Sequence, residues 1–311
     1  MSRRAGGVAV VLFAASLWGL SGTAAQILFD GRGVSPELLV TVRLWGAAAL
    51  LLLAIALRRP RSLRLQRRDL LQVAIFGLFG FFLVQYSYFA TIAAAGVATA
   101  TFLQYLGPAL IVLYTAIAGR RLPSAAESVA LLLAVGGTAL LVLGAGGLRV
   151  TGAGLGWGLF SAAALAFYTI YPVQLLRRLG PWTTSAYGFL FGAIAATVFL
   201  PQHFGAIGQL LSKDLLLVLF VVVFGTLIAF ALYVSALRHL TPTEVGIAAT
   251  AEPLSAAASA YLVLGQALQG WQYVGGGLIM AAVVVLAALG GRSAAPRVER
   301  TAVSAGGRPD P

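Results

Sequence analysis

The sequence predicts an all-α integral membrane protein with ten transmembrane helices, arranged as two inverted five-helix repeats around a central cavity. Three observations predict this fold class. Of the 311 residues, 60% are hydrophobic and only 10% are charged; the charges, together with expected tight turns at 93–97 and 265–270, divide the chain into ten apolar segments; and one stretch recurs in the second half. A soluble protein of this length needs more charged residues to cover its surface, so the lipid bilayer is the expected environment.

The apolar segments are long enough to be helical spans, since a hydrocarbon core of about 30 Å needs about 20 helical residues. Membrane β-strands would alternate in polarity over about ten residues, and these segments do not. The first segment is long and no clear cleavage site follows it, so we interpret it as a retained helix. The expected spans are 7–29, 36–57, 69–93, 97–118, 124–146, 152–176, 181–200, 213–237, 243–264 and 270–290.

The basic residues predict the orientation of these spans. With ten spans, all but four of the 21 basic residues lie on the side of the N-terminus; the exceptions are Arg32, Arg43, Arg149 and Lys213. Short cytoplasmic loops are enriched in Lys and Arg. We therefore expect both termini in the cytoplasm and the protein in a bacterial cytoplasmic (inner) membrane. The tail, 292–311, is rich in Ala, Gly, Pro and Arg and is expected to be disordered.

An internal repeat is the third observation. The stretches "YFATIAAAGVATATFLQYLGPAL" (88–110) and "YVSALRHLTPTEVGIAATAEPLS" (233–255) align without a gap, so that Tyr88 falls on Tyr233 and Pro108 on Pro253. They occupy spans 3–4 and 8–9 of ten. Five spans is an odd number, so a repeated half enters the membrane upside down. Inverted repeats are a transporter architecture with a site near the bilayer midplane. The expected repeats are 1–148 and 149–291.

Several of these segments resemble a known family. "ASLWGLSGTAAQIL" (15–28) and "PELLVTVRLWGAAALLL" (36–52) look like the first two helices of the ten-helix EamA-like family of the drug/metabolite transporter superfamily. "TATFLQYLGPALIVLYTAIAG" (99–119) and "VGIAATAEPLSAAASAYLVLGQ" (245–266) resemble the proline-bearing helix of each half. The family often ends these helices in Gly-Glu, where this chain has Gly119-Arg120 and Gly265-Gln266. The resemblance implies export of small metabolites and, in one branch, of aromatic and other amino acids.

Polar residues inside spans usually face the bundle interior or a water-filled cavity. Those that share helix faces predict a substrate pathway, although a membrane Tyr or Trp is also a common packing or interface residue. The candidate pathway residues are Trp18, Gln85, Tyr88, Thr101, Gln104, Tyr105, Tyr168, Tyr233, Glu252 and Ser255.

Glu252 is the most informative of these residues because it is a carboxylate about ten residues, or roughly 15 Å, into its span. Three interpretations remain open. It is a protonated structural residue, a cavity residue that binds a substrate amine, or a group that carries protons during exchange. No basic residue in its own span or hairpin partner is available to pair with it, so burial favours the protonated form.

Other charged residues have structural explanations. Ser124 and Glu127 have the spacing of a capping box at the start of span 5. Asp69 and Asp214 begin spans 3 and 8, where the helix dipole favours a negative charge. Arg43 is expected near the outer face, where it extends toward the interface, pairs with Glu37 or Asp30, or contacts the substrate directly. Pro172 is expected to kink span 6.

The sequence argues against an enzyme. It has no cysteine, two histidines, one lysine and no HExxH, GxSxG or P-loop motif, so no catalytic residue, metal or cofactor is expected. Its basic residues form no nucleic-acid-binding face. The favoured function is a secondary transporter that exports small metabolites, most readily neutral amino acids or related amphipathic compounds, by alternating access. The alternative is a channel or passive facilitator. The expected partners are the lipid bilayer, a small-molecule substrate and protons as a candidate coupling ion, with the protein a monomer or weak dimer.

Overall fold

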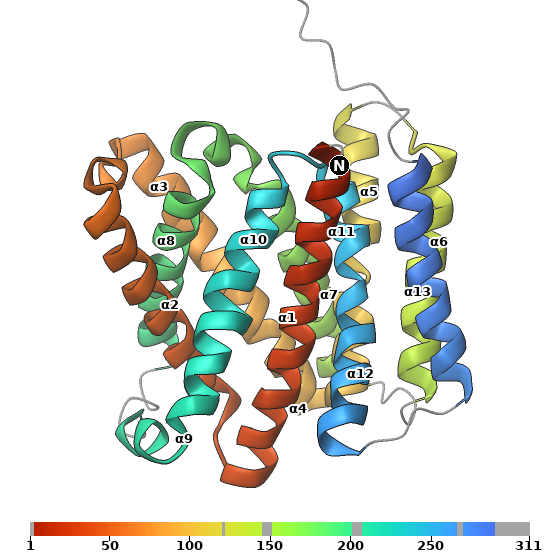
Figure 1. The fold of residues 1–311 in the computed structure, drawn as a ribbon, viewed down its shortest axis with the longest axis horizontal. Coiled ribbons are helices and arrows are strands. Elements are labelled where there is room, and N and C mark those ends of the chain that lie inside the picture. The colour runs from red at the N-terminus through yellow and green to blue at the C-terminus, as the bar shows by residue number, and fades with distance from the viewer. Residues whose placement is uncertain (1–2, 120–121, 145–150, 201–206, 266–269, 290–311) are drawn as a thin grey trace, which may run out of the picture.

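The computed structural model describes residues 3–119, 122–144, 151–200, 207–265 and 270–289, and the secondary structure of these residues is helical throughout (Figure 1). The predicted tail and the boundary between the predicted repeats lie outside these ranges. The elements are α1 (Arg3–Arg32), α2 (Pro36–Arg58), η1 (Pro60–Leu63), α3 (Arg67–Ile75), η2 (Phe76–Phe82), α4 (Leu83–Gln104), α5 (Gly107–Gly119), α6 (Ala125–Gly144), α7 (Gly152–Ile170), α8 (Pro172–Phe199), α9 (Ile207–Val222), η4 (Val223–Ile228), α10 (Ala229–Ala236), α11 (Pro242–Ala249), α12 (Ala251–Leu264) and α13 (Gly270–Leu289).

Seven helical stretches of the described chain are long and apolar enough to cross a membrane. They are Arg4–Phe29, Pro36–Arg58, Arg67–Ile92, Ala100–Gly119, Gly152–Ile170, Pro172–Phe199 and Lys213–Ala236. Two shorter apolar helices, Ala125–Leu140 and Gly270–Leu286, lie within two further predicted spans. The remaining predicted span, 243–264, is divided at Thr250 into α11 and α12. The all-helical membrane fold that the sequence predicts is therefore confirmed.

The sixth predicted span ends differently from the expectation. The boundary between two helices falls at the expected proline, since α7 ends at Ile170 and α8 begins at Pro172, although Tyr171 between them keeps helical angles. Span 6 was expected to run to residue 176, but two helices within α8 meet at Gly180, which has φ 73°. Glycine occupies this left-handed conformation without the steric cost of a side chain. The following helix then starts at Pro181, at the predicted beginning of span 7.

α4 folds back on itself between Tyr88 and Thr101. The two hydroxyl groups are 3.0 Å apart. In a straight helix thirteen residues would separate them by about 20 Å. The reversal falls between the two membrane-crossing stretches that end at Ile92 and begin at Ala100. The sequence predicts a tight turn in this interval, at "AAAGV" (93–97).

Two π-helical segments interrupt corresponding spans. η2 precedes α4 and η4 precedes α10, and shifting η2 by the 145 residues of the sequence repeat brings it within two residues of η4. Glycine allows close packing at both segments. A side chain on Gly77 would meet the backbone of Gly188 and Gly192 in α8, and one on Gly225 would overlap the side chain of Ser21 in α1. π-helical segments are rare and are frequently found at functional sites.

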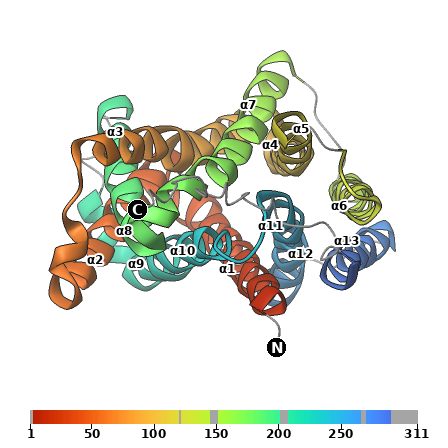
Figure 2. The same ribbon diagram turned by 90° about the horizontal axis from the view of Figure 1, so that it is seen from above.

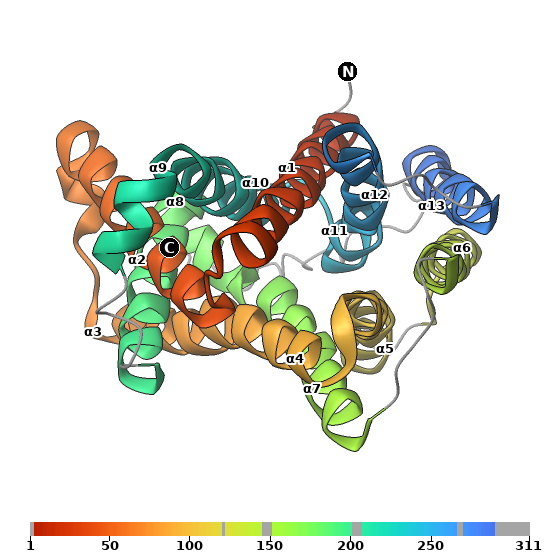
Figure 3. The ribbon, with the colours of Figure 1, turned by 90° about the horizontal axis from the view of Figure 1, so that it is seen from below.

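The helices form one bundle with α1 near its middle (Figures 2 and 3). α1 packs against α12 on one side and against α10 and η4 on the other. α4 packs along α7, and α2 packs along α8. α6 and α13 pair with each other at one edge of the bundle. α1 therefore packs directly against α10 and α12, which carry the predicted pathway residues Tyr233, Glu252 and Ser255.

Capping and ion pairs fix the ends of the helices. Ser124 and Glu127 exchange the two hydrogen bonds of a capping box, which confirms that prediction. Thr241 and Glu244 form a second capping box at the start of α11. Arg4 pairs with Glu244 at 2.8 Å and so ties the first turns of α1 to α11. Further ion pairs join Arg32 to Asp214 at 3.2 Å and Arg178 to Asp69 at 3.1 Å.

Candidate functional site

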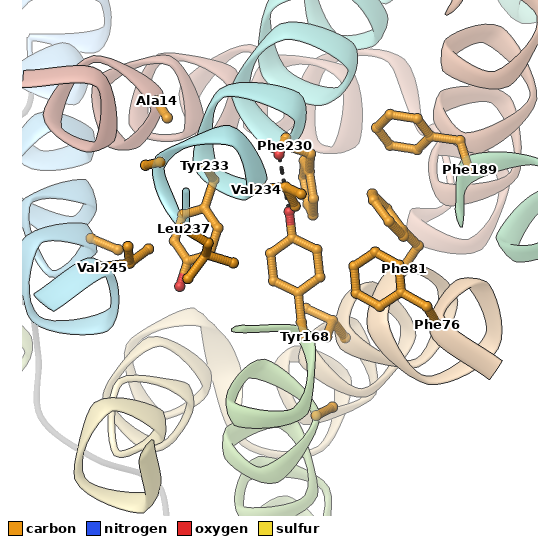
Figure 4. Close-up of a cluster of buried hydrophobic side chains, with 14 of the residues drawn as sticks. Ala14, Phe76, Phe81, Tyr168, Phe189, Phe230, Tyr233, Val234, Leu237 and Val245 are labelled. Atoms are coloured by element: carbon orange, nitrogen blue, oxygen red, sulfur yellow. Dashed lines mark hydrogen bonds between the residues drawn. The ribbon is translucent and has the colours of Figure 1, made fainter. Parts of the chain in front are cut away.

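An aromatic cluster lies at the centre of the bundle, beside both π-helical segments (Figure 4). Tyr168 of α7 is fully buried, stacks on Tyr233 with a ring distance of 5.3 Å, and donates a hydrogen bond to the carbonyl of Phe230. Tyr233 of α10 exchanges a 2.7 Å hydrogen bond with Thr169. Phe76 and Phe81 of η2 pack against Tyr168 from the other side. Two predicted pathway residues, Tyr168 and Tyr233, therefore form part of a packed core.

A polar cluster adjoins this core where two helices are broken. The helical chain is interrupted at Tyr105 and Leu106, between α4 and α5, and again at Thr250, between α11 and α12. The Tyr105 hydroxyl donates a 2.5 Å hydrogen bond to the carboxylate of Glu252, so the two breaks meet. Tyr105 is buried, whereas Glu252 is only partly buried. An internal carboxylate is thus held at the junction of two broken helices.

Two further tyrosines, Tyr88 and Tyr233, lie near Glu252. Tyr88, partly buried on α4, bonds to Thr101 and lies within electrostatic range of the carboxylate. Tyr233 lies within the same range. The structure thus brings together five predicted pathway residues that are far apart in sequence: Tyr88, Thr101, Tyr105, Tyr233 and Glu252.

The interior face of α1 borders open space. Phe13 and Leu20 share one face of this helix and are 56% and 41% exposed, as expected for a face that contacts lipid. Gly22 is nine residues, or two and a half turns, after Phe13 and therefore lies on the opposite face. Gly22 is nevertheless exposed, and a Cβ built on it meets nothing within 4 Å. The bundle interior is therefore open beside Gly22.

Trp18 and Gln26 share the face of Gly22, at spacings of four residues. Gln26 is exposed, and the indole nitrogen of Trp18 is buried without a hydrogen-bond partner among the described residues. The Trp18 ring packs on Phe230 and Tyr233 at 4.8 and 5.1 Å. A buried donor without a partner costs free energy, so it points to water or a ligand in the adjoining space. The sequence prediction includes Trp18 but omits Gln26, whose four-residue spacing from Gly22 was the available signal.

Two predicted pathway residues make contacts between helices, and a third bonds within its own span. Ser255 donates to the carbonyl of Ala15 and so joins α12 to α1. Gln104 donates to Ser161 of α7 at 2.9 Å. Gln85 donates to the carbonyl of Phe81, while its own amide oxygen is buried without a partner in the described structure. The geometry assigns Ser255 and Gln104 at least a packing role.

Arg43 differs most from its expected position. Instead of extending to the interface, it is 9% exposed. Its Nε donates to Thr226 at 2.7 Å and its Nη2 to the carbonyl of Gly225 at 3.4 Å, both in η4. Arg43 also lies within electrostatic range of Glu252. The sequence expectation considered only basic residues in the span and hairpin of Glu252, so it did not include Arg43.

This arrangement suits reversible binding of a polar solute. It combines a carboxylate, a guanidinium, tyrosine hydroxyl groups and aromatic faces next to open space. Among the described residues there is no group of three or more His, Cys, Asp or Glu side chains that could hold a metal ion.

Comparisons with known proteins agree with a membrane fold. The EamA-like transporter family matches the chain twice, over residues 5–143 and 152–288. An uncharacterised inner membrane transporter of Salmonella typhimurium, YicL, is 33% identical over 90% of this chain and 94% of its own length. An uncharacterised transporter of Bacillus subtilis, YwfM, is 27% identical over 95% of this chain and 96% of its own.

A solved crystal structure has the same fold, with a TM-score of 0.77 and 21% identity over 90% of this chain and 96% of that one. The family matches cover both halves of the chain, and these two relatives are named as transporters. The chain is an integral membrane protein that belongs to the EamA-like transporter family.

Proposed function

We propose that this protein is a secondary transporter that exports small metabolites, namely neutral amino acids or related amphipathic compounds, by alternating access. The observation that carries the proposal is the hydrogen bond between Tyr105 and Glu252, which joins two broken helices beside open interior space. Secondary transporters commonly bind substrate at broken helices where two repeats meet. A packed structural core would not need a carboxylate at that point.

Ten spans in two inverted repeats are part of the proposal. The seven membrane-crossing stretches, the two shorter apolar helices and the divided α11–α12 account for ten. The helix break at Tyr105 corresponds to the break at Thr250 at the 145-residue offset of the sequence repeat, and η2 corresponds to η4. The two family matches support the same division, with repeats at 1–148 and 149–291.

We further propose that both termini face the cytoplasm of a bacterial cell, with the protein in the inner membrane. Because the natural chain has no cysteine, single cysteines can be placed without background labelling. We expect Lys213→Cys to react with a membrane-impermeant maleimide added to whole cells. Ser62→Cys, in the arginine-rich loop after α2, should react only after the cells are permeabilised. Labelling of Ser62→Cys in intact cells contradicts this orientation.

Proton coupling is proposed to act through Glu252. Glu252→Gln keeps the shape of the side chain but cannot exchange a proton. We expect this variant to fold and to lose the dependence of transport on an imposed pH gradient. Glu244→Gln is the matched control, because Glu244 caps α11 and pairs with Arg4 away from the site. If Glu252→Gln keeps the full pH dependence, Glu252 is a structural residue and the coupling proposal fails.

The transport proposal is tested with the purified full-length protein in vesicles loaded with radiolabelled neutral amino acids. We expect efflux to exceed that of protein-free vesicles and to accelerate when the outside is made acidic, since entering protons would then drive export. Failure of every amino acid in the set to leave faster than from protein-free vesicles contradicts the proposed function.

A further inference from the structure

An acidic and a basic side chain lie inside the bundle without forming an ion pair. Glu252 accepts a hydrogen bond from the neutral hydroxyl of Tyr105, and Arg43 donates to a hydroxyl and a carbonyl of η4. The ion pairs between described side chains that lie within 4.0 Å involve other residues. Arg43 and Glu252 therefore influence each other electrostatically but are not in contact.

Both charged groups have unused binding capacity. A guanidinium carries five N–H donors in a planar fork that matches a carboxylate. The Nη1 group of Arg43 has no hydrogen-bond partner in the described part of the chain, although the side chain is nine-tenths buried. The carboxylate of Glu252 accepts one bond among the described residues and can accept more. A buried charge is costly unless it is paired. The guanidinium of Arg43 and the ionised carboxylate of Glu252 therefore favour a ligand that pairs with both groups.

The two groups adjoin the same turn of α1. Gly19 packs against Ser255, which lies one turn after Glu252. Ser21 packs against Gly225, whose carbonyl accepts the bond from Arg43. Gly22, on the same turn, borders open space. A ligand in that space would have Glu252 toward one side and Arg43 toward the other.

We propose that this space is a binding site for a zwitterion, with the ammonium group of the ligand on Glu252 and its carboxylate on Arg43. This inference rests on the proposed function and assigns the two residues that bind the charged groups of its substrate. A simple cation would be repelled by Arg43 and a simple anion by Glu252, whereas a zwitterion satisfies both charges. The faces of Trp18 and Tyr88 offer an apolar surface for a side chain and can attract an ammonium group.

The test uses three ligands with one common side chain: phenylalanine, phenethylamine, which lacks the carboxylate, and 3-phenylpropionate, which lacks the ammonium. A parallel set is leucine, isoamylamine and 4-methylpentanoate. Each competes with efflux of the parent amino acid from vesicles that contain the full-length protein. For the unmodified protein, we expect the amino acid to compete at least about tenfold better than either analogue, because each analogue leaves one charge unpaired.

Two substitutions should change this preference in opposite directions. The measured quantity is the inhibition of efflux by the amine relative to that by the acid. Arg43→Gln should raise this ratio about tenfold, and Glu252→Gln should lower it about tenfold. Arg43→Lys and Glu252→Asp keep the charges and should keep the preference for the amino acid. Glu244→Gln is the matched control and should leave the ratio unchanged.

The outcomes separate this inference from the proposed function. If the unmodified protein transports neither parent amino acid, the proposed function fails together with the zwitterion site. If it transports an amino acid but the amine or the acid competes equally well, only the zwitterion site is wrong. A third outcome is that the two glutamine variants fold and change the inhibition by all three ligands to the same extent. In that case Arg43 and Glu252 do not recognise the charged groups of the ligand, and the inference is also wrong.

Discussion

Gly19→Leu is expected to prevent stable folding of the protein. A Cβ at this position would overlap the Ser255 hydroxyl and approach the backbone nitrogen of Ala256 to 2.5 Å. The obstacle includes backbone, which cannot rotate away, so α1 and α12 would have to separate. Small residues allow close helix packing in membranes, and overpacking a tight contact typically costs about 1–3 kcal/mol or more. The loss is measured as a lower melting temperature and less monodisperse protein in detergent.

The matched control for this substitution is Gly6→Leu, in the same helix. A Cβ on Gly6 meets nothing within 4 Å, so this variant should purify like the unmodified protein. Gly22→Ala, close to Gly19, should also fold normally for the same reason. If Gly19→Leu melts at the same temperature as Gly6→Leu, α1 and α12 do not pack as described.

Gly22→Trp is expected to abolish transport while leaving the protein folded. The indole would occupy the open interior space beside Gly22. The Cβ of the new side chain would meet no atom within 4 Å, so no neighbouring residue has to move to admit it. Leu20→Trp is the control, because Leu20 is 41% exposed on the lipid side of the same helix. We expect efflux by Gly22→Trp to fall at least about tenfold, which corresponds to about 1.4 kcal/mol in the transport barrier. Leu20→Trp should keep most of its activity.

Melting temperature and transport must be measured on the same preparations of these two variants. A folded Gly22→Trp protein with normal transport would mean that the space beside Gly22 is not on the substrate path. Equal losses in Gly22→Trp and Leu20→Trp would point to a general effect of tryptophan in α1. Either result argues against the interior site.

The sequence was sufficient to predict an all-helical membrane fold because charges are expensive inside a bilayer and therefore collect at helix ends. It was also sufficient to single out Glu252, since a carboxylate within an apolar span is rare. The capping box of Ser124 and Glu127 could be predicted because its hydrogen bonds join residues only three positions apart. These features depend on local sequence or on depth in the membrane.

The neighbours of each residue across the bundle could not be predicted in the same way. The position of Arg43 within its span indicates depth, but not that the side chain turns toward η4. Helical spacing predicts that Ser255 and Glu252 share a helix face, but it does not reveal that α1 approaches closely enough at Gly19 to pack against the serine. The hydrogen bond from Tyr105 to Glu252 joins residues 147 positions apart and depends on where both helices break.

The most direct test of the central claim, that this protein is an alternating-access carrier, is a counterflow measurement. Vesicles containing the purified protein are loaded with unlabelled phenylalanine or leucine and diluted into a trace of the same labelled amino acid, with no pH gradient. A carrier exchanges one bound molecule for another, so we expect transient accumulation of label above its external concentration, with Gly22→Trp showing none. A channel or passive pore lets the label only equilibrate, and equilibration without accumulation would contradict the account.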